Sequence, residues 1–264
     1  MNIAEPTADV RLPSFRLDKK VALVTGAGTG LGAAIAIGLA ESGAEVLLVG
    51  RTRVTLDQTA AAISRLGAKS KTVVCDVTDS SAIRREIDAF PRLDVLINNA
   101  GTNFPEPFVE VSEAHLDAML DLNVRAAFVV AQAAVRKMLE APDRAGEGGA
   151  VINISSQMGH VGSPNRTVYC MTKHAIEGLT KAMAVELAPK NIRVNSIGPT
   201  FSDTPLVRRI VDTPEKRDFV MSRIPMGKLC RLEDIMSAAV FLASPAAAMI
   251  TGTHLIVDGG WTAQ

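Results

Sequence analysis

Seven short apolar runs divide the chain. They cover residues 21–24, 46–49, 73–75, 95–97, 151–154, 194–197 and 255–257. Short runs of this kind are typical of strands that are buried on both faces of a sheet. Because segments with helical spacing separate many of the runs, we expect right-handed crossovers and helices on both faces. The pattern therefore predicts a doubly wound α/β fold with a single parallel sheet of about seven strands.

Helices are expected in the intervals between these runs. Apolar residues recur at helical spacing over 30–42 and over 54–66, and Gly43 and Gly67 stand where these helices should end. A further helix is expected after Ser80, and longer helical segments lie between the later runs. This alternation of strand and helix continues along most of the chain.

The remaining segments are expected to be irregular. Residues 1–16 are polar, contain two prolines and show no periodicity, which predicts a loose leader. No composition shift or linker divides residues 17–264, so we expect a single domain there. Residues 141–150 are expected to form a surface loop. Residues 200–226 are expected to form a long irregular connection of the kind that often serves as a lid.

Composition narrows the possible classes of protein. The 264 residues include 28 Lys and Arg against 28 Asp and Glu, a balance that argues against binding to nucleic-acid phosphates. The hydrophobic fraction of 47% excludes a disordered chain. No stretch approaches about 18 uninterrupted apolar residues, so neither a membrane span nor a signal peptide is expected. Three widely spaced cysteines predict buried thiols in a reducing, cytoplasmic location: Cys75, Cys170 and Cys230.

A glycine-rich turn directly follows the first predicted strand. Residues 25–32, with the sequence TGAGTGLG, connect that strand to the first predicted helix. Small residues here allow the backbone to approach a pyrophosphate, and the amides at the helix N-terminus supply hydrogen-bond donors. The turn therefore predicts a dinucleotide-binding Rossmann fold.

The T-G-x-x-x-G-x-G spacing of this turn resembles the fingerprint of the short-chain dehydrogenase/reductase family in its compact branch. More motifs of that family follow in order: Asp76-Val77, the NNAG segment 98–101, Asn123, Ser156, the Y-x-x-x-K pair Tyr169 and Lys173, the segment 199–204, and VDGG at 257–260. The resemblance covers nearly the whole chain. It implies an NAD(P)-dependent oxidoreductase that interconverts a ketone and a secondary alcohol.

The resemblance also implies which residues contact the cofactor and which act in the chemical step. The cofactor contacts are Gly26, Gly28, Thr29, Gly30, Leu31, Asp76, Val77, Asn99, Gly101, Tyr169, Lys173, Pro199, Thr200, Phe201 and Thr204. The implied catalytic residues are Asn123, Ser156, Tyr169 and Lys173.

Tyr169 is the only tyrosine in the chain, and the proposed chemistry depends on its ionisation. A free phenol has a pKa of about 10, so it does not act as a base at neutral pH unless its phenolate is stabilised. Lys173 lies four positions later on the same helix face, so its charge and that of an oxidised nicotinamide should lower the phenol pKa. Ser156 is expected to bind the substrate oxygen. The resemblance implies that Asn123 orders a water linking Lys173 to solvent, and Lys173 should also reach the nicotinamide ribose.

The end of the second predicted strand bears on the choice of cofactor. The strand ends at Gly50-Arg51, with Arg53 close by and no carboxylate. An acidic residue there would bind the ribose hydroxyls, whereas an arginine suits a 2′-phosphate. We therefore expect NADP(H) in preference to NAD(H). Both cofactors stay open, because Thr29 replaces a basic residue that some NADP-preferring relatives carry in the turn.

The substrate is expected to be a small keto acid, a sugar acid or a 3-oxoacyl group. The family subgroups that fit are the 3-oxoacyl-acyl carrier protein reductases and the gluconate 5-dehydrogenases, and the Val-Gly-Arg strand end favours the latter. The pocket is expected to draw on Phe104, Gln157, Met158, His160, Val161, Arg166 and the segment 201–226, whose Arg208, Arg209 and Arg223 suit a carboxylate or phosphate.

No metal site is expected, because the four histidines at 115, 160, 174 and 254 lack metal-ligand spacing. Family members of this size usually form tetramers, so a homotetramer or a homodimer is expected. Its candidate interface is the apolar segment 235–242 with Trp261, although core packing explains that segment equally well.

Two other classes of protein remain as alternatives. A catalytically silent nucleotide-sensing regulator would keep the fold and lose Ser, Tyr or Lys, yet all three are present. A nucleotide-sugar epimerase of the family's extended branch would need a T-G-x-x-G-x-x-G turn and a larger substrate domain. Neither of those features is present in this sequence.

Overall fold

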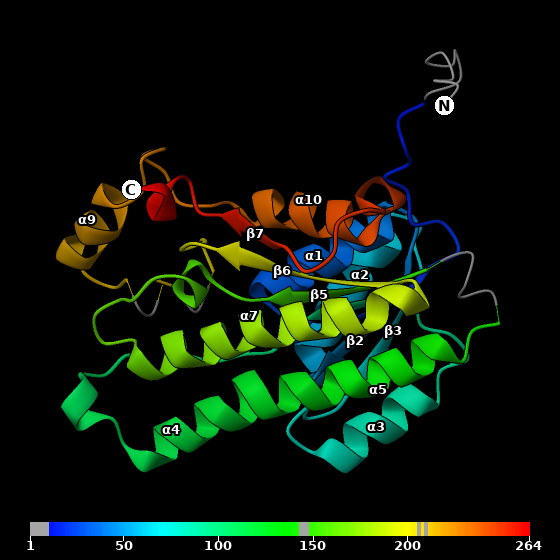
Figure 1. The fold of residues 1–264 in the computed structure, drawn as a ribbon, viewed down its shortest axis with the longest axis horizontal. Coiled ribbons are helices and arrows are strands. Elements are labelled where there is room, and N and C mark those ends of the chain that lie inside the picture. The colour runs from blue at the N-terminus through cyan, green and yellow to red at the C-terminus, as the bar shows by residue number, and fades with distance from the viewer. Residues whose placement is uncertain (1–10, 143–147, 205–206, 209–210) are drawn as a thin grey trace, which may run out of the picture.

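The computed structural model describes residues 11–142, 148–204, 207–208 and 211–264. A single parallel sheet of seven strands runs through it in the order β3-β2-β1-β4-β5-β6-β7 (Figure 1). The predicted sheet is therefore confirmed, and each predicted run contributes to a strand. The strands are β1 Val21–Thr25, β2 Glu45–Gly50, β3 Ser70–Val74, β4 Val95–Asn98, β5 Gly149–Ile154, β6 Ile192–Pro199 and β7 His254–Val257.

The third strand differs from its prediction. It begins at Ser70 rather than at Val73, and Cys75 lies beyond its end. Because β3 is an edge strand and only Val73 within it is buried, its first residues are polar and give no apolar signal.

Helices cover both faces of the sheet, as the alternation of elements predicts. One core cluster joins the sheet to α1, α2 and α10, and a second joins it to α3, α5 and α7 on the opposite face (Figure 1). The doubly wound arrangement is thus confirmed. The helices are α1 Gly30–Glu41, α2 Arg53–Arg65 and α10 Leu232–Ala243 on one side, and α3 Ser80–Asp88, α5 Ala127–Leu139 and α7 Thr167–Leu187 on the other.

A long continuous helical stretch precedes β5. It consists of α4 Glu113–Leu120, the π-helical segment η2 Asp121–Ala126 and α5. By length and composition this stretch, Glu113–Leu139, could cross a membrane, and 56% of its most apolar window is buried inside the fold. Several of its buried side chains, Val130 and Met138 among them, belong to the second core cluster, and α5 packs against α3. We therefore interpret it as a core helix of this fold.

The long connection after β6 is not irregular throughout. Residues Pro214–Ser222 form the helix α9, which corrects the expectation for 200–226. Its start follows a recognisable signal, since the Thr213 hydroxyl accepts a hydrogen bond from the Lys216 amide and Pro214 occupies the first turn. Residues 205–206 and 209–210 of this connection lie outside the described residues.

Two of the segments expected to be irregular are only partly described. Residues 1–10 of the expected leader and 143–147 of the expected loop lie outside the described residues. Residues 11–16 are exposed, whereas Leu17 is 1% exposed and belongs to the first core cluster. The boundary proposed at residue 17 thus coincides with the first buried side chain of the described segment.

The strand order places a crevice at the centre of the sheet. The chain adds strands outward on one side of β1 (β2, then β3) and then crosses to β4 on its other side. In open parallel sheets, ligands bind at the carboxyl ends of the strands beside such a reversal. The glycine turn after β1 and the NNAG segment after β4 therefore face each other across this point.

A close approach between backbones makes Gly32 a test of this geometry. A Cβ at Gly32 would lie 2.2 Å from the Gly26 carbonyl oxygen. Gly32→Ala is therefore expected to lower the free energy of unfolding by about 1–3 kcal/mol in urea titrations. Gly178→Ala is the matched control, because this exposed helical glycine has nothing within 4 Å of the added Cβ. It should raise stability by about 0.5–1 kcal/mol. Equal stability of Gly32→Ala and the parent protein would contradict the close packing.

Candidate active site

A cleft of about 540 Å³ opens at the carboxyl ends of the central strands. It is lined by residues from the glycine turn and from the segments after β2, β3, β4, β5 and β6, with a contribution from α7. The cleft brings together nearly every residue predicted from the sequence: Gly26, Gly28, Thr29, Gly30, Leu31, Arg51, Asp76, Val77, Asn99, Gly101, Ser156, Tyr169, Lys173, Pro199, Thr200, Phe201 and Thr204. Asn123 is not among the lining residues.

The glycine turn leaves the first amides of α1 open to an anion. Gly26 and Gly30 have φ angles of +66° and +56°, in the left-handed region that glycine adopts without strain. Thr29 caps α1 but its side chain makes no capping hydrogen bond, and the first turn holds no acidic residue. These amides and the positive end of the helix dipole therefore suit a pyrophosphate.

Hydrogen bonds tie the glycine turn to the segment after β4. The Thr25 hydroxyl accepts from the amides of Asn99 and Ala100 at 2.9 and 3.0 Å, and the Asn99 side chain donates to the Thr25 carbonyl at 2.9 Å. Thr25 is fully buried. The floor of the cleft is thereby fixed on both sides of the strand-order reversal.

Asn123 sits in the π-helical segment and is held from several directions. Its side chain accepts from the Thr102 amide at 2.8 Å and donates to the Thr102 carbonyl at 2.9 Å. It also donates to the Thr172 hydroxyl on α7 at 3.2 Å. Such π segments recur at functional sites, and this one positions the amide next to the end of the NNAG segment. Asn123 thus connects the segment after β4 to α7 through hydrogen bonds.

Ser156 and Tyr169 form the polar centre of the cleft. Ser156 begins the short helix η3 Gln157–Gly159, and its hydroxyl oxygen accepts from the Met158 amide at 3.1 Å. Burial raises the pKa of Tyr169 to about 12, while a hydrogen bond with Ser156 and the charge of Arg166 act in the opposite direction. At neutral pH the chain alone therefore holds Tyr169 as the neutral phenol.

Lys173 is buried and faces a backbone carbonyl. Its Nζ donates to the Ile154 carbonyl at 2.9 Å and lies 5.5 Å from the centre of the Tyr169 ring. Burial lowers the pKa of Lys173 to about 8, and the charge of Glu177 opposes this lowering. The charge of Arg166 acts to lower the pKa of Tyr169. The further lowering expected from Lys173 together with an oxidised nicotinamide stays a prediction.

The predicted cofactor-selecting residue is exposed at the rim. The Arg51 side chain is 74% exposed and lies 3.8 Å from the Asp76 carboxylate. Burial raises the pKa of Asp76, but hydrogen bonds from Thr78 and the charge of Arg51 bring it below its ordinary value. The Arg51 contact is loose, so the guanidinium can turn toward a phosphate.

Several buried polar groups that line the cleft have no partner within the described part of the chain. Gln157 is 1% exposed, and neither atom of its amide makes a hydrogen bond. The same holds for Asn103 Oδ1 and for the Thr200 hydroxyl. Buried polar atoms are rarely left unpaired, so these groups point to a polar ligand. Sequence reasoning selected Gln157 and Thr200 but missed Asn103.

Other pocket predictions have mixed outcomes. Met158 and Arg166 line the cleft, whereas Phe104, His160, Val161 and Arg223 are not among its lining residues. Phe104 instead stacks on His115 with ring centres 4.3 Å apart. Arg208 pairs with Asp203 at 2.8 Å, which withdraws it from a substrate, and Arg209 lies outside the described residues.

The cysteine and histidine predictions also change with the structure. Cys75 and Cys230 are buried as expected, but Cys170 is only half-buried. Spacing along the chain indicated no metal ligands, yet the fold brings His160 and His254 next to Glu177. The three residues come from separate elements, so no local pattern could reveal the cluster.

Comparison with known proteins gives consistent matches along the chain. The family model described as enoyl-(acyl carrier protein) reductase, a model of short-chain dehydrogenases/reductases, matches residues 26–262. An L-xylulose reductase from Bos taurus is 38% identical over 249 residues, which is 94% of this chain and 99% of that protein. A gluconate 5-dehydrogenase from Gluconobacter oxydans is 37% identical over 252 residues, covering 94% of this chain and 96% of that protein.

Solved structures agree with these matches. The crystal structure of a gluconate 5-dehydrogenase from Burkholderia cenocepacia, in complex with NADP and tartrate, superposes with a TM-score of 0.89. It is 33% identical in sequence, and the alignment covers 96% of this chain and 99% of that one.

Proposed function

Because the chain belongs to the short-chain dehydrogenase/reductase family, we propose that Ser156, Tyr169 and Lys173 are its catalytic residues. The protein is an NAD(P)-dependent oxidoreductase that interconverts a ketone and a secondary alcohol. The observation that carries the assignment of residues is their convergence with the glycine turn in one cleft.

The cleft fits a nicotinamide dinucleotide. The open first turn of α1 suits the pyrophosphate, and the buried Thr200 hydroxyl, unpaired among the described residues, suits a polar group at the other end of the cofactor. The glycine turn, Asp76 and residues of the segment 199–204 all line this cleft. When bound, the nicotinamide supplies or accepts the hydride.

The chain's own residues handle the proton and the substrate oxygen. Tyr169 donates a proton to the carbonyl oxygen during reduction and takes it back during alcohol oxidation. Ser156 holds the same oxygen, since its hydroxyl lies within hydrogen-bonding contact of Tyr169. Lys173 adds a positive charge 5.5 Å from the centre of the Tyr169 ring. Asn123 donates to the Thr172 hydroxyl on the same helix.

NADP(H) is the favoured cofactor, and Arg51 is proposed to select it. The guanidinium is exposed at the cleft rim, where it can bind the 2′-phosphate, and no carboxylate ends β2. The relative from Burkholderia cenocepacia binds NADP, which supports the same choice.

A charge reversal at this position tests the selection. Arg51→Asp is expected to raise KM for NADPH by about 10-fold to 100-fold with little change for NADH, because a charged phosphate contact is worth about 1.5–3 kcal/mol. Initial rates with each cofactor measure the effect. Arg53→Asp is the matched control, since Arg53 lies outside the cleft lining and contacts Thr72. Equal changes for both cofactors in Arg51→Asp would contradict the assignment.

The substrate is proposed to be a polyhydroxylated ketone or a sugar acid. The unpaired amide of Gln157 and the Asn103 oxygen offer hydrogen bonds to hydroxyl groups. Arg166 is 9% exposed and donates only to the Asn165 carbonyl in the described structure, so its charge is suited to a carboxylate. The relatives named for xylulose and gluconate support this class over a 3-oxoacyl group.

A substrate panel tests the proposal. Ketoses, keto sugar acids and acyl thioesters are assayed with NADPH and NADH by nicotinamide absorbance. Turnover of the first two classes, with kcat/KM well above that for thioesters, is the expected result. Activity confined to thioesters would overturn the substrate class. Cofactor binding without turnover of any class would favour the silent nucleotide-sensing regulator.

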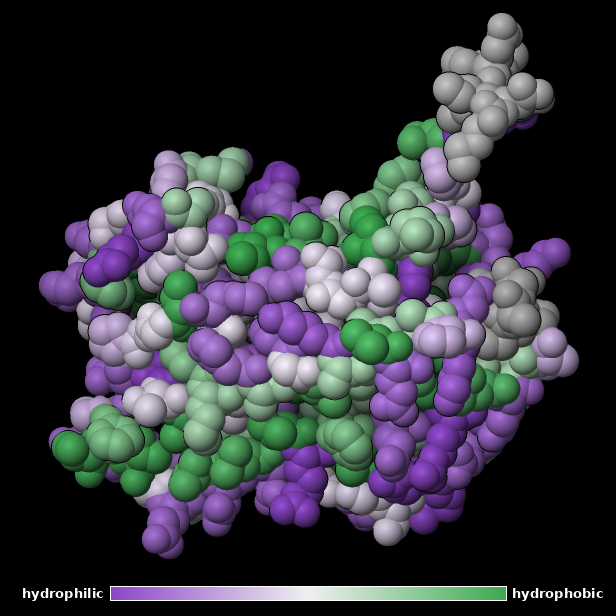
Figure 2. Space-filling view, in the orientation of Figure 1, coloured by the Kyte–Doolittle hydropathy of each residue, from purple (hydrophilic) through white to green (hydrophobic). Residues whose placement is uncertain are grey.

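We further propose a cytoplasmic homotetramer or homodimer. The predicted interface segment 235–242 is partly core, because Ile235 and Leu242 are at most 1% exposed. Exposed apolar side chains on other elements are better placed for an interface, and Figure 2 shows green surface along the face formed by the short helix η1 Phe108–Glu110 with α4, α5 and α7. These side chains are 47–87% exposed and include Phe108, Val109, Phe128, Met171 and Val185. A light-scattering mass equal to one chain would contradict this proposal.

A further inference from the structure

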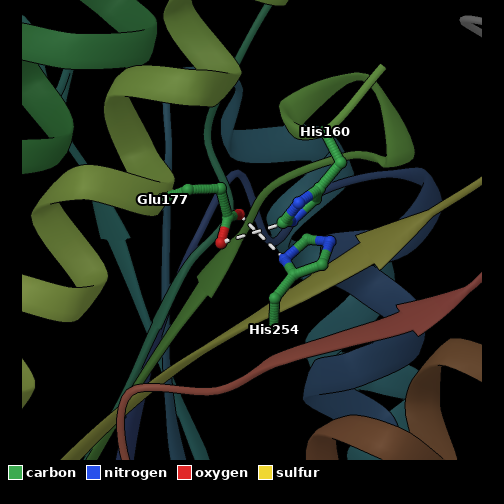
Figure 3. A group of neighbouring side chains, drawn as sticks. All are labelled: His160, Glu177 and His254. Carbon is green, nitrogen blue, oxygen red and sulfur yellow. Dashed lines mark ion pairs between the residues drawn. The ribbon is translucent and has the colours of Figure 1, made fainter.

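A cluster of three metal-ligating side chains lies behind the cleft, outside its lining. His160 follows η3, Glu177 lies on α7 one turn beyond Lys173, and His254 begins β7 (Figure 3). Both imidazole rings are directed at the Glu177 carboxylate in Figure 3. We propose that these three residues bind one divalent transition-metal ion of the zinc class.

The distances suit such an ion. The His254 Nδ1 lies 2.9 Å from Glu177 Oε1, and the His160 Nε2 lies 3.8 Å from Glu177 Oε2. The candidate ligand atoms of all three residues lie within 4.8 Å of one another. Bonds of about 2.0–2.1 Å to Zn²⁺ place tetrahedral ligand atoms about 3.4 Å apart. The two contacts of the carboxylate fall on either side of that value, so small side-chain shifts complete the site.

The cluster is buried and incompletely paired. The side chains of His254 and Glu177 are 6% and 7% exposed. Within the described structure, Glu177 Oε1 makes no hydrogen bond. It faces His254 Nδ1 at 2.9 Å without hydrogen-bond geometry, as two ligands of one ion would. Because buried polar atoms are rarely left unpaired, this oxygen lacks a partner that an ion would supply.

A neighbouring hydroxyl orients the carboxylate, and a partly exposed histidine gives an ion access from solvent. The Ser196 hydroxyl donates to Glu177 Oε2 at 2.8 Å and so orients the carboxylate. It also lies 2.9 Å from His254 Nδ1, a contact that a bound ion would replace. The His160 side chain is 33% exposed and leaves a path from solvent and an open coordination position. Two imidazoles with one carboxylate favour zinc and its neighbours over Mg²⁺ or Ca²⁺, which prefer oxygen ligands.

The proposed site connects three elements, two of which are next to catalytic residues: Ser156 precedes η3, and Tyr169 lies on α7. An ion there would tie the segment after Ser156 and η3 to α7 and β7. It would bind the folded chain and not the unfolded one, so it would raise the unfolding temperature. The proposal does not rest on the proposed function, because the ligands lie outside the cleft and metal binding is measured without turnover.

Metal content in solution tests the proposal. Protein freed of any affinity tag is stripped with a chelator, dialysed against Zn²⁺ and analysed for bound zinc. His160→Ala is the first variant because its partly exposed side chain can be removed without opening the core. His254→Gln is the second. His174→Gln on the exposed face of α7 is the matched control. Binding of Co²⁺ is followed in parallel through its visible absorption.

The proposal expects one Zn²⁺ per chain in the parent protein and in His174→Gln, with loss in His160→Ala and His254→Gln. It also expects a higher unfolding temperature with Zn²⁺, no such rise with Mg²⁺, and Co²⁺ absorption that the same two variants abolish. Zinc contents that do not differ between the parent and His160→Ala would overturn it. Equal loss in His174→Gln would also overturn it, because it would indicate adsorption at surface histidines.

Discussion

Tyr169→Phe is expected to lower kcat by about 10²–10⁴-fold in both directions while leaving cofactor affinity within a few-fold of the parent protein. The Tyr169 hydroxyl is the group proposed to exchange a proton with the substrate oxygen, and it lines the same cleft as Ser156. Its loss removes the acid and base without removing the phosphate-binding turn. Steady-state rates and fluorescence titration with NADPH measure the two quantities separately.

Cys170→Ala serves as the control for this substitution. Cys170 is the next residue on α7 and is half-buried, and nothing assigns it a role in the chemistry. Its variant should keep kcat within a few-fold. Parent-like turnover in Tyr169→Phe would sink the proposed mechanism, and loss of cofactor binding would show that the variant reports on the fold instead.

Lys173→Met is expected to lower kcat/KM for alcohol oxidation at neutral pH by about 10²-fold or more. Alcohol oxidation needs the phenolate of Tyr169, whose pKa burial raises to about 12 in the chain alone. In the parent enzyme, the charges of Lys173 and the oxidised nicotinamide stabilise that phenolate, so oxidation becomes efficient at lower pH. Without Lys173 the rate should rise with pH beyond the range in which the parent rate reaches its plateau.

The sign of the effect is opposite for the two directions. Ketone reduction needs the neutral phenol, so its rate should fall as pH rises through the phenol pKa. Lys181→Met is the matched control, because Lys181 is an exposed lysine two turns further along the same helix. It should leave both pH profiles unchanged. An unshifted oxidation profile in Lys173→Met would contradict the electrostatic role of Lys173.

The sheet could be predicted from sequence because its strands are buried on both faces. A run such as 46–49 is apolar throughout because each side chain lies in a core, and all four residues are at most 2% exposed. The start of β3 was not predicted because the residues of this edge strand are mostly exposed or half-buried and give no apolar run. Helix α9 was not predicted because its apolar spacing is weak, although Thr213 and Pro214 are residues typical of a helix start.

The cleft was predictable to the extent that motifs sit at strand ends. Parallel strands bring their carboxyl ends to one edge, so the turns after β1 and β4 had to meet once the strand order was set. The direction of a long side chain was not predictable in this way. Lys173 donates to Ile154, a partner nineteen residues away, and this contact depends on how α7 packs against the sheet, where it contacts β6.

Contacts among distant elements were invisible to spacing. His160, Glu177 and His254 belong to a loop, a helix and a strand, and they meet only because α7 and β7 both pack near β6. The same reasoning applies to Arg166, which acts on Tyr169 through space although the sequence suggested only a pocket role.

The most direct test of the account uses the single tyrosine. Isotope labelling of tyrosine gives one side-chain NMR signal, because Tyr169 is the only tyrosine in the chain. Its titration is measured with and without NADP⁺ and compared with the pH profile of alcohol oxidation. We expect a Tyr169 pKa of about 12 in the free protein, a marked fall of this pKa on NADP⁺ binding, and agreement of the lowered value with the kinetic profile. A phenol pKa that NADP⁺ leaves unchanged, in an enzyme whose oxidation rate reaches its plateau near neutral pH, would contradict it.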